Sequence, residues 1–479
     1  MGGRTEWTCA GPGAGPMCAD APTHMTPTHR RTAILFTLTF TLASCRDDDD
    51  GTPANDEAAD DGATTGADLD TSSGGSSGAV EPPAVSYWSD VKPLLDARCV
   101  ACHREGGIAP FSLETYADAA TWAVPSLAAI DAGIMPPWPP AAGCNSFVGA
   151  RELTLDQVET IATWIEDETP EGDPNDEGAP LPDTEPGLSR VDASLPMPEE
   201  YTPQSSPDDY RCFLVDWPAE YDATTYVTGF RAVPGNDAIV HHVIAFLATP
   251  DQRDAYAELD AAEDGPGYTC FGGTGGPSRT WLGGWAPGSA GTDLPPGLGL
   301  EVQPGSQVIL QVHYNTAAGA PAPDLTAVEF KIDDEVETVA RVMPWANPTW
   351  LAPDGMPIPA GEPDVVHEFG RDPTMLAGGP LVVYSAALHM HQLGTQGTLS
   401  ITRPSGETAC LLQIDDWDFH WQGSYGFVDP IRIEPGDELH LECHWDNSAA
   451  NQSTDPKDVQ WGEGTGDEMC LGVLLTAPG

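Results

Sequence analysis

Two histidines, His389 and His391, flank a single methionine in the segment YSAALHMHQLG, residues 384–394. Side chains on a β-strand alternate between its two faces, so these two imidazoles would point to one side of a strand and Met390 to the other. Two imidazoles directed at one point could bind a metal ion. The alternative is a polar stripe on the protein surface, and this spacing alone does not decide between the two.

A second segment with chemistry in its spacing is CVACH, Cys99–His103, which has the Cys-x-x-Cys-His pattern of c-type heme attachment. Its two thiols, Cys99 and Cys102, are one helical turn apart and can bond the vinyl groups, while the imidazole of His103 reaches the iron from one face. The alternatives are a disulfide or a redox-active pair, but a redox pair would need a thioredoxin-like βαβ context, which is not visible here.

A second axial ligand for the heme iron should follow downstream. Met135 is the only methionine between residues 87 and 171. A thioether ligand raises the potential and suits electron transfer. In the alternative, Met135 only packs and leaves the iron open or water-bound.

The chain around CVACH has helical periodicity from residue 87 to residue 171. Apolar residues recur at helical intervals in WSDVKPLLDARC and again in LTLDQVETIATWIED, where Ser89 and Thr154 are cap candidates. Segment 87–171 is therefore predicted to be a small all-α domain. The stretch HREGGIAPFSLETYADA resembles the small cytochrome c domains of exported bacterial proteins.

Beyond the Pro-rich acidic linker 172–195, the pattern becomes that of β-strands. Alternating runs such as VILQVHYN and RIEPGDELHLECHW are separated by Gly and Pro turns. The predicted fold class is mainly β, and the length favours two sandwich subdomains over one, at residues 196–345 and 346–479.

The N-terminus predicts export. Segment 25–45, MTPTHRRTAILFTLTFTLASC, has two arginines and then an apolar run too short to span a bilayer, which fits a signal peptide. LASC resembles a bacterial lipobox, which would make Cys45 the lipidated first residue of a periplasmic or cell-surface lipoprotein. The alternative is a plain signal peptide cleaved elsewhere. Residues 1–24 precede this expected start, and the acidic, Gly/Ser-rich stretch 46–86 is predicted to be a disordered tether.

Charge excludes some partners. The chain has 19 Lys and Arg against 74 Asp and Glu, a net charge of −55. This balance argues against phosphate-mediated binding of nucleic acid and against electrostatic docking on anionic lipid, so membrane association is expected through a lipid anchor only.

The histidines outside the heme motif fall in a particular order. DAIVHHVIAF contains His241 and His242, VILQVHYN contains His313, ALHMHQLG contains the pair described above, and GDEMCLGVLL contains Met469. This order of His-His, His, His-x-His and Met-Cys over residues 196–479 resembles the copper type II, ascorbate-dependent monooxygenases, the family of peptidylglycine α-hydroxylating and dopamine β-monooxygenases.

The resemblance implies a two-copper enzyme on two jelly-roll subdomains. His241, His242 and His313 match the electron-supplying copper site, and His389, His391 and Met469 match the oxygen-activating one. Imidazole suits both copper oxidation states, and a soft thioether favours Cu(I). Because adjacent histidines on a regular strand diverge, the His-His pair needs a twist or a strand end to share one metal.

The resemblance also implies a disulfide between Cys443 and Cys470. The cysteines Cys144, Cys212, Cys270 and Cys410 are left without an assigned pairing. Met390 is expected in the core. His440 and His444 would lie on the same face of a strand, as in a polar surface stripe. His367 and His420 are unassigned, with a substrate pocket one option for His420. As we align them, peptide-amidating members have an arginine where this chain has Ala387, so peptide recognition is in doubt and the substrate is open.

The sequence therefore predicts an exported, lipid-anchored monooxygenase with two coppers and one heme c. It would insert one oxygen atom of O2 into a C–H bond of a small molecule, with electrons from ascorbate or from the fused heme domain. The competing hypothesis is a non-catalytic copper and heme protein for electron transfer or copper binding at the surface.

Overall fold

The structure is a computed structural model that describes residues 85–479, except residues 106–108, 183–186, 272, 279, 288, 317–319, 420, 453 and 463. The signal segment 25–45 with Cys45, nearly all of the tether and His420 lie outside these residues. Within the described part of the chain, no helix is both long and apolar enough to cross a membrane.

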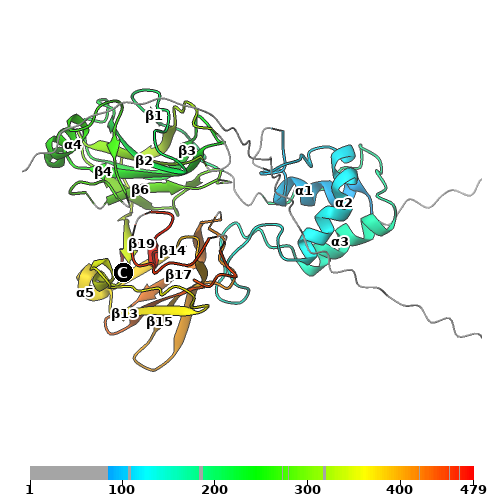
Figure 1. The fold of residues 1–479 in the computed structure, drawn as a ribbon. Coiled ribbons are helices and arrows are strands. Elements are labelled where there is room, and N and C mark those ends of the chain that lie inside the picture. Colours follow the sequence, from blue (N-terminus) through cyan, green and yellow to red (C-terminus); the bar gives the residue numbers. More distant parts are fainter. Residues whose placement is uncertain are drawn as a thin grey trace, which may run out of the picture. The chain divides into compact units, whose positions relative to one another are not determined.

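Residues 85–171 form a helical region (Figure 1) with the π-helical turn η1 Tyr87–Val91, α1 Lys92–Arg98, α2 Tyr116–Asp131 and α3 Leu155–Glu166. Thr154 caps α3 as predicted, in a capping box with Gln157. Ser89 does not cap the first helix, because it lies inside η1. The small core of this region consists of Tyr87, Val91, Leu95, Leu113, Ala119, Ala123 and Trp164.

The first β-sandwich packs a six-stranded sheet on a five-stranded one. In the six-stranded sheet the order is β1 Ala193–Pro196, β10 Ala327–Asp333, β3 Thr225–Val233, β8 Leu298–Val302 and β11 Thr338–Val339, with β7 Thr292–Asp293 beside β3. In the other sheet the order is β5 Tyr268–Thr269, β2 Asp208–Asp216, β9 Gln307–Asn315, β4 Val240–Ala248 and β6 Thr280–Trp285. One core joins both sheets, with Phe230 and Phe330 from the first and Phe213 and Leu310 from the second.

On the outer side of the five-stranded sheet packs α4 Arg253–Ala261, which follows η2 Pro250–Gln252. Tyr256 of α4 is fully buried in a cluster with the Cys212–Cys270 disulfide.

The second β-sandwich consists of two four-stranded sheets. One sheet has the order β12 Arg341–Trp345, β19 Leu471–Pro478, β14 Leu381–His389 and β17 Ser424–Ile433. The other has the order β13 Val365–Arg371, β18 Glu438–Trp445, β15 Gly394–Thr402 and β16 Thr408–Ile414. The short helices η3 Pro348–Leu351 and α5 Thr374–Ala377 lie in the connections.

The core of the second sandwich contains the disulfide between Cys443 of β18 and Cys470, the bond that the resemblance implied. The mainly β class and the sandwich architecture agree with the prediction, whereas jelly-roll connectivity stays a prediction. Strand β12 pairs with β19, so the sheet of the second sandwich begins at Arg341, before the predicted boundary at residue 345.

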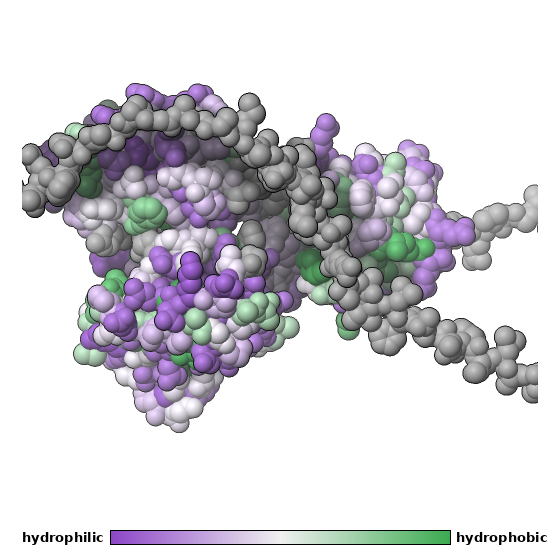
Figure 2. Space-filling view, in the orientation of Figure 1, coloured by the Kyte–Doolittle hydropathy of each residue, from purple (hydrophilic) through white to green (hydrophobic). Residues whose placement is uncertain are grey.

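The surface in view is hydrophilic over much of the β-rich part, and hydrophobic residues gather in patches on the helical part (Figure 2). In the helical region, Trp122, Val124 and Ile134 are 37%, 66% and 62% exposed. Only Ala119 and Ala123 of the 16-residue α2 are buried. The helical region therefore presents apolar side chains that its own small core does not cover.

Candidate metal centres

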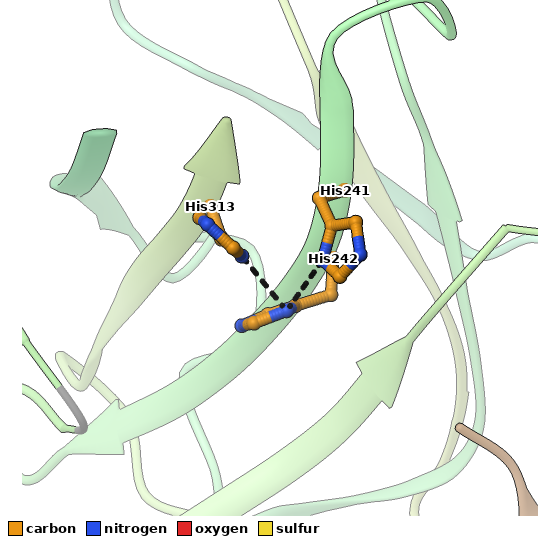
Figure 3. Close-up of side chains that lie close together, drawn as sticks. All are labelled: His241, His242 and His313. Carbon is orange, nitrogen blue, oxygen red and sulfur yellow. Dashed lines mark hydrogen bonds between the residues drawn. The ribbon is translucent and has the colours of Figure 1, made fainter. Parts of the chain in front are cut away.

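Three histidines meet on two neighbouring strands of the five-stranded sheet (Figure 3). His241 and His242 lie on β4, and His313 lies on β9, directly opposite His242 in the register. The register shifts between Val240 and His242, which leaves His241 as an extra residue on β4. Such a bulge re-aims a side chain, and it brings two adjacent histidines to one point where a regular strand would separate them.

The nitrogen atoms of this cluster have the spacing of metal ligands. The Nδ1 atom of His242 lies 3.4 Å from Nδ1 of His241 and 3.3 Å from Nδ1 of His313. For nitrogen–metal bonds of about 2.0 Å, two ligand nitrogens in a three- or four-coordinate site lie roughly 3.3–3.5 Å apart. The three imidazoles therefore fit one metal ion bound through Nδ1.

The orientation of His313 is fixed from behind. Its Nε2 atom lies 2.9 Å from Oδ1 of Asp208, whose carboxylate also accepts a hydrogen bond from Asn315. Tyr210 stacks on the ring at 3.9 Å between centroids, with an interplanar angle of 6°. A carboxylate on one ring nitrogen sets the tautomer and leaves the other nitrogen to bind the metal.

Burial favours the neutral form of two of these rings, those of His242 and His313. It lowers the pKa of His242 well below its ordinary value, and the neighbouring His313 and His241 lower it further. Burial also lowers the pKa of His313, although Asp208 opposes that shift. Neutral imidazole is the form that binds metals, so His242 and His313 are in the metal-binding form at neutral pH.

In the second pair, His389 and His391, the ring nitrogens have the opposite roles, because Nδ1 is bonded to the protein in both. His389 ends β14, and its Nδ1 lies 2.5 Å from Oε1 of Gln422. The Nδ1 atom of His391 donates to the backbone oxygen of Asp467 at 3.0 Å. Because both Nδ1 atoms are engaged, Nε2 is the nitrogen that remains available for a metal in each ring. The ring centroids lie 5.1 Å apart, and burial lowers the pKa of His389 to about 3.

The two methionines next to this pair differ in their surroundings. Met390 is fully buried in the core of the second sandwich, as predicted from strand alternation. Met469 is 5% exposed and follows Glu468. The backbone of Glu468 accepts a hydrogen bond from Gly462 and donates one to Gln460. Its place as the third ligand stays a proposal.

Glu468 has a positioning role that the sequence analysis missed. Its fully buried carboxylate accepts hydrogen bonds from the backbone N–H of His391 at 2.9 Å, from the N–H of Leu393 at 2.7 Å and from Trp445 Nε1 at 2.8 Å. Burial raises its pKa to about 7, against these hydrogen bonds. No sequence signal separates Glu468 from the other 73 acidic residues.

Phe419 lies between the two histidine groups. Its ring stacks on His241 at 5.1 Å and meets His391 edge-on at 6.2 Å. The sequence offered no reason to single it out, because it lies in the irregular loop between β16 and β17.

The heme-type motif lies at the end of α1. His103 is 8% exposed, and its Nδ1 lies 3.1 Å from the backbone oxygen of Phe111. This bond leaves Nε2 available for an axial bond to iron. Cys99 and Cys102 are half-buried and lie outside the three disulfides. These features fit heme attachment. Met135 is half-buried in the turn after α2, and its role stays a prediction.

The remaining histidines and cysteines have structural surroundings. His440 and His444 point outward from β18 beside Glu438 and Glu442, which fits a surface stripe. His367 lies 2.9 Å from the backbone oxygen of Pro357 through Nε2. The cysteines without a predicted pairing form the bonds Cys212–Cys270 and Cys144–Cys410.

Each of the two sandwiches is similar to one domain of the same family of known proteins. Residues 194–320 match the family model described as "Copper type II ascorbate-dependent monooxygenase, N-terminal domain", and residues 371–475 match the C-terminal domain of that family. DBH-like monooxygenase protein 1 of Homo sapiens is 26% identical over 260 residues, which cover 51% of this chain and 40% of that protein. Its counterpart in Gallus gallus is 24% identical over 305 residues, covering 59% and 46%.

This chain thus spans less than half the length of these curated relatives. A solved structure described as "Structure of PNGF-II in P21 space group" covers 60% of this chain and 65% of its own, at 11% identity and a TM-score of 0.25. The first β-sandwich, with the cluster of three histidines, is thus similar to the N-terminal domain of the copper type II ascorbate-dependent monooxygenases, and the second, with the His-x-His pair, is similar to their C-terminal domain.

Proposed function

We propose that this protein is a copper-dependent monooxygenase that hydroxylates a C–H bond of a small molecule. The balanced reaction consumes the substrate R–H, one O2, two electrons and two protons, and it yields R–OH and water. The electrons come from an enediol reductant such as ascorbate or from a heme c in the helical region.

The observation that carries this proposal is the spacing of the three Nδ1 atoms of His241, His242 and His313, at 3.3 and 3.4 Å. Three imidazoles at metal-ligand separation, two of them held neutral by burial, support a metal site. The family match of both sandwiches makes copper the expected metal.

His389, His391 and Met469 are the proposed ligands of the second copper. Two imidazoles and a thioether form a soft ligand set that favours Cu(I). When bound, the coppers would supply one-electron redox chemistry and the activation of O2. Gln422, the backbone oxygen of Asp467 and the carboxylate of Glu468 hold the two rings in place.

The face of the sheet beside His389 supports a substrate without a carboxylate. Ala387 shares that face and pairs with Ser424 on β17 and with Val473 on β19, while Ser385 pairs with Gly426. These neighbours are small and neutral, so none of them could bind a carboxylate as an ion pair. The exposed Asp415, Asp416 and Asp418 in the nearby loop favour cationic or neutral molecules.

The electron route through heme c is a proposal from the motif Cys99, Cys102 and His103, with Met135 as the second axial ligand. The bond from His103 Nδ1 to Phe111 and the uncovered apolar side chains of this region support it. A net charge of −55 also disfavours the approach of an anionic donor such as ascorbate. An internal donor would avoid this repulsion.

Export as a lipoprotein anchored through Cys45 to a periplasmic or cell-surface membrane is also a proposal. Three disulfides in the described residues support an oxidising compartment. The test is fractionation, in which the Cys45→Ser protein should leave the membrane fraction for the soluble one. Wild-type protein that is already soluble would contradict the anchor.

Oxygen consumption tests the enzymatic proposal. Copper-loaded protein with ascorbate should consume O2 and form a hydroxylated product from some member of a panel of small amines and amides. The His313→Ala protein should form none, because the first cluster needs all three imidazoles. Copper binding without any substrate-dependent O2 consumption would favour a copper and heme electron-transfer or copper-binding protein instead.

A further inference from the structure

Segment 138–148 belongs in sequence to the helical region, between α2 and α3, but it bonds to the second sandwich. Cys144 forms a disulfide with Cys410 of β16. The backbone N–H of Ala141 donates to the oxygen of Gln413 at 2.7 Å, and the side chain of Asn145 donates to the oxygen of Leu411. Of the three disulfides in the described residues, this one alone joins the helical region to a sandwich.

The same segment also pairs with the other sheet of that sandwich. Val148 donates its N–H to the oxygen of Gly426 at 2.7 Å, and Val428 donates to the oxygen of Ser146 at 2.9 Å, so residues 146–148 extend the sheet beyond β17. Phe147 is 8% exposed and belongs to the core of the sandwich. Because β16 and β17 are the edge strands of their sheets, the segment covers both edges at once.

Between these two edge strands lies loop 415–423, which contacts both histidines of the second pair. Gln422 accepts from Nδ1 of His389 at 2.5 Å, and Trp417 Nε1 donates to the backbone oxygen of His391 at 3.1 Å. The loop begins just after Ile414, which bridges to Pro140, and ends just before β17, where Phe427 bridges to Phe147. Both ends of the loop are therefore held by segment 138–148.

We propose that segment 138–148 is a clamp through which the helical region holds loop 415–423, and with it the second copper site, in binding geometry. The inference rests on the proposed function, because it assumes that His389 and His391 bind copper. It goes beyond that function by making the helical region a positioning element of the second site, whether or not that region also transfers electrons.

The physical reason is that a metal ligand depends on the groups behind it. Substitution of a residue that orients a ligand typically lowers metal affinity or activity about 10- to 100-fold. Gln422 and Trp417 lie on an irregular loop, so their positions depend on where the loop ends are fixed. Without the clamp, those ends would belong to edge strands paired on one side only.

The test is the copper affinity of each site in full-length protein, measured by competition with a chelator. The clamp is opened in the double variant Cys144→Ser with Cys410→Ser, and weakened in Phe147→Leu, which keeps the disulfide. Leu155→Ala on α3, where the side chain is 87% exposed, is the matched control in the same region. X-ray absorption assigns each copper, because only the second site has a sulfur ligand.

In both clamp variants we expect the second copper to be lost at about tenfold lower chelator concentration than in wild type, with the first copper unchanged. The Leu155→Ala protein should match wild type. If the double variant does not fold, Phe147→Leu decides. A folded clamp variant that retains both coppers as tightly as wild type, or loses both equally, overturns the clamp alone. Wild-type protein that binds no copper at His389 and His391 overturns the proposed function as well.

Discussion

The imidazole of His313 lies between two partners, with Nε2 2.9 Å from Asp208 and Nδ1 3.3 Å from Nδ1 of His242. The carboxylate thus holds a proton on the far side of the ring, and the near side faces the cluster. A residue about a hundred positions away in the sequence therefore decides which nitrogen of His313 can bind a metal.

This relationship predicts the effect of Asp208→Asn. The amide can no longer act as a charged acceptor for Nε2–H, so copper affinity of the first site should fall about 10- to 100-fold. Chelator competition measures it. Asp216→Asn is the control, because that carboxylate is 68% exposed and forms a surface ion pair with Arg253. Equal losses in the two variants would mean that the effect is general and does not act through His313.

Two methionines near the second pair should respond in opposite ways. Met469→Ile keeps the bulk but removes the proposed soft ligand, so turnover and Cu(I) binding at the second site should collapse while the first copper stays. Met390→Leu changes a fully buried core side chain at similar volume and should cost less than about 1.5 kcal/mol of stability. Loss of activity in Met390→Leu with activity kept in Met469→Ile would show that Met469 is not the third ligand.

Glu468→Gln should weaken the second site through the backbone. The new NH2 group replaces one carboxylate oxygen and faces N–H donors that it cannot accept from. In one orientation of the amide these donors belong to His391 and Trp445, and in the other to Leu393. A buried donor without an acceptor costs about 1–3 kcal/mol. Thermal unfolding and copper titration should both show the loss. Glu442→Gln, on the outward face of β18, should leave both unchanged, and a silent Glu468→Gln would refute the positioning role.

Covalent heme is testable without any copper. Protein matured in an exporting host should show a c-type absorption spectrum that survives acid-acetone extraction. The double variant Cys99→Ala with Cys102→Ala should lose covalent attachment, because both thiols that form thioether bonds are removed. Heme that extracts freely from wild type would show that the motif does not attach it.

Metal-free protein should lose stability as pH falls. The pKa of His389 is about 3 in the folded state against 6.5 in an ordinary histidine, so the unfolded chain binds an extra proton between these values. Stability therefore declines on acidification from about pH 6.5, by about 1.4 kcal/mol per pH unit for each such histidine. Glu468 has the opposite effect on stability, because its pKa is about 7 in the folded state. Between its usual pKa and pH 7 the folded state binds the extra proton.

The contribution of one histidine is isolated by the His389→Gln protein. Its midpoint of urea unfolding should depend less steeply on pH below 6.5 than that of wild type, by the equivalent of one proton. Identical slopes would mean that His389 is not held neutral by burial.

The sequence determined the features that depend on neighbours in the chain. Strand alternation predicted that Met390 faces the core, helical periodicity and capping predicted α3 from Thr154, and the heme-type motif needs only five consecutive residues. The order of His-His, His, His-x-His and Met-Cys indicated the family because each motif is local and the order of motifs is preserved along the chain.

The tertiary structure decided what depends on pairing between distant strands. The register shift at β4 lets His241 and His242 face one point, and no residue in the sequence of this strand indicates such a shift. Asp208, Gln422 and Glu468 support histidines that lie 105, 33 and 77 positions away. The Cys144–Cys410 bond joins residues 266 positions apart. Such contacts depend on which strands become neighbours in the packed sandwiches, and that arrangement is fixed by the whole core rather than by any local pattern.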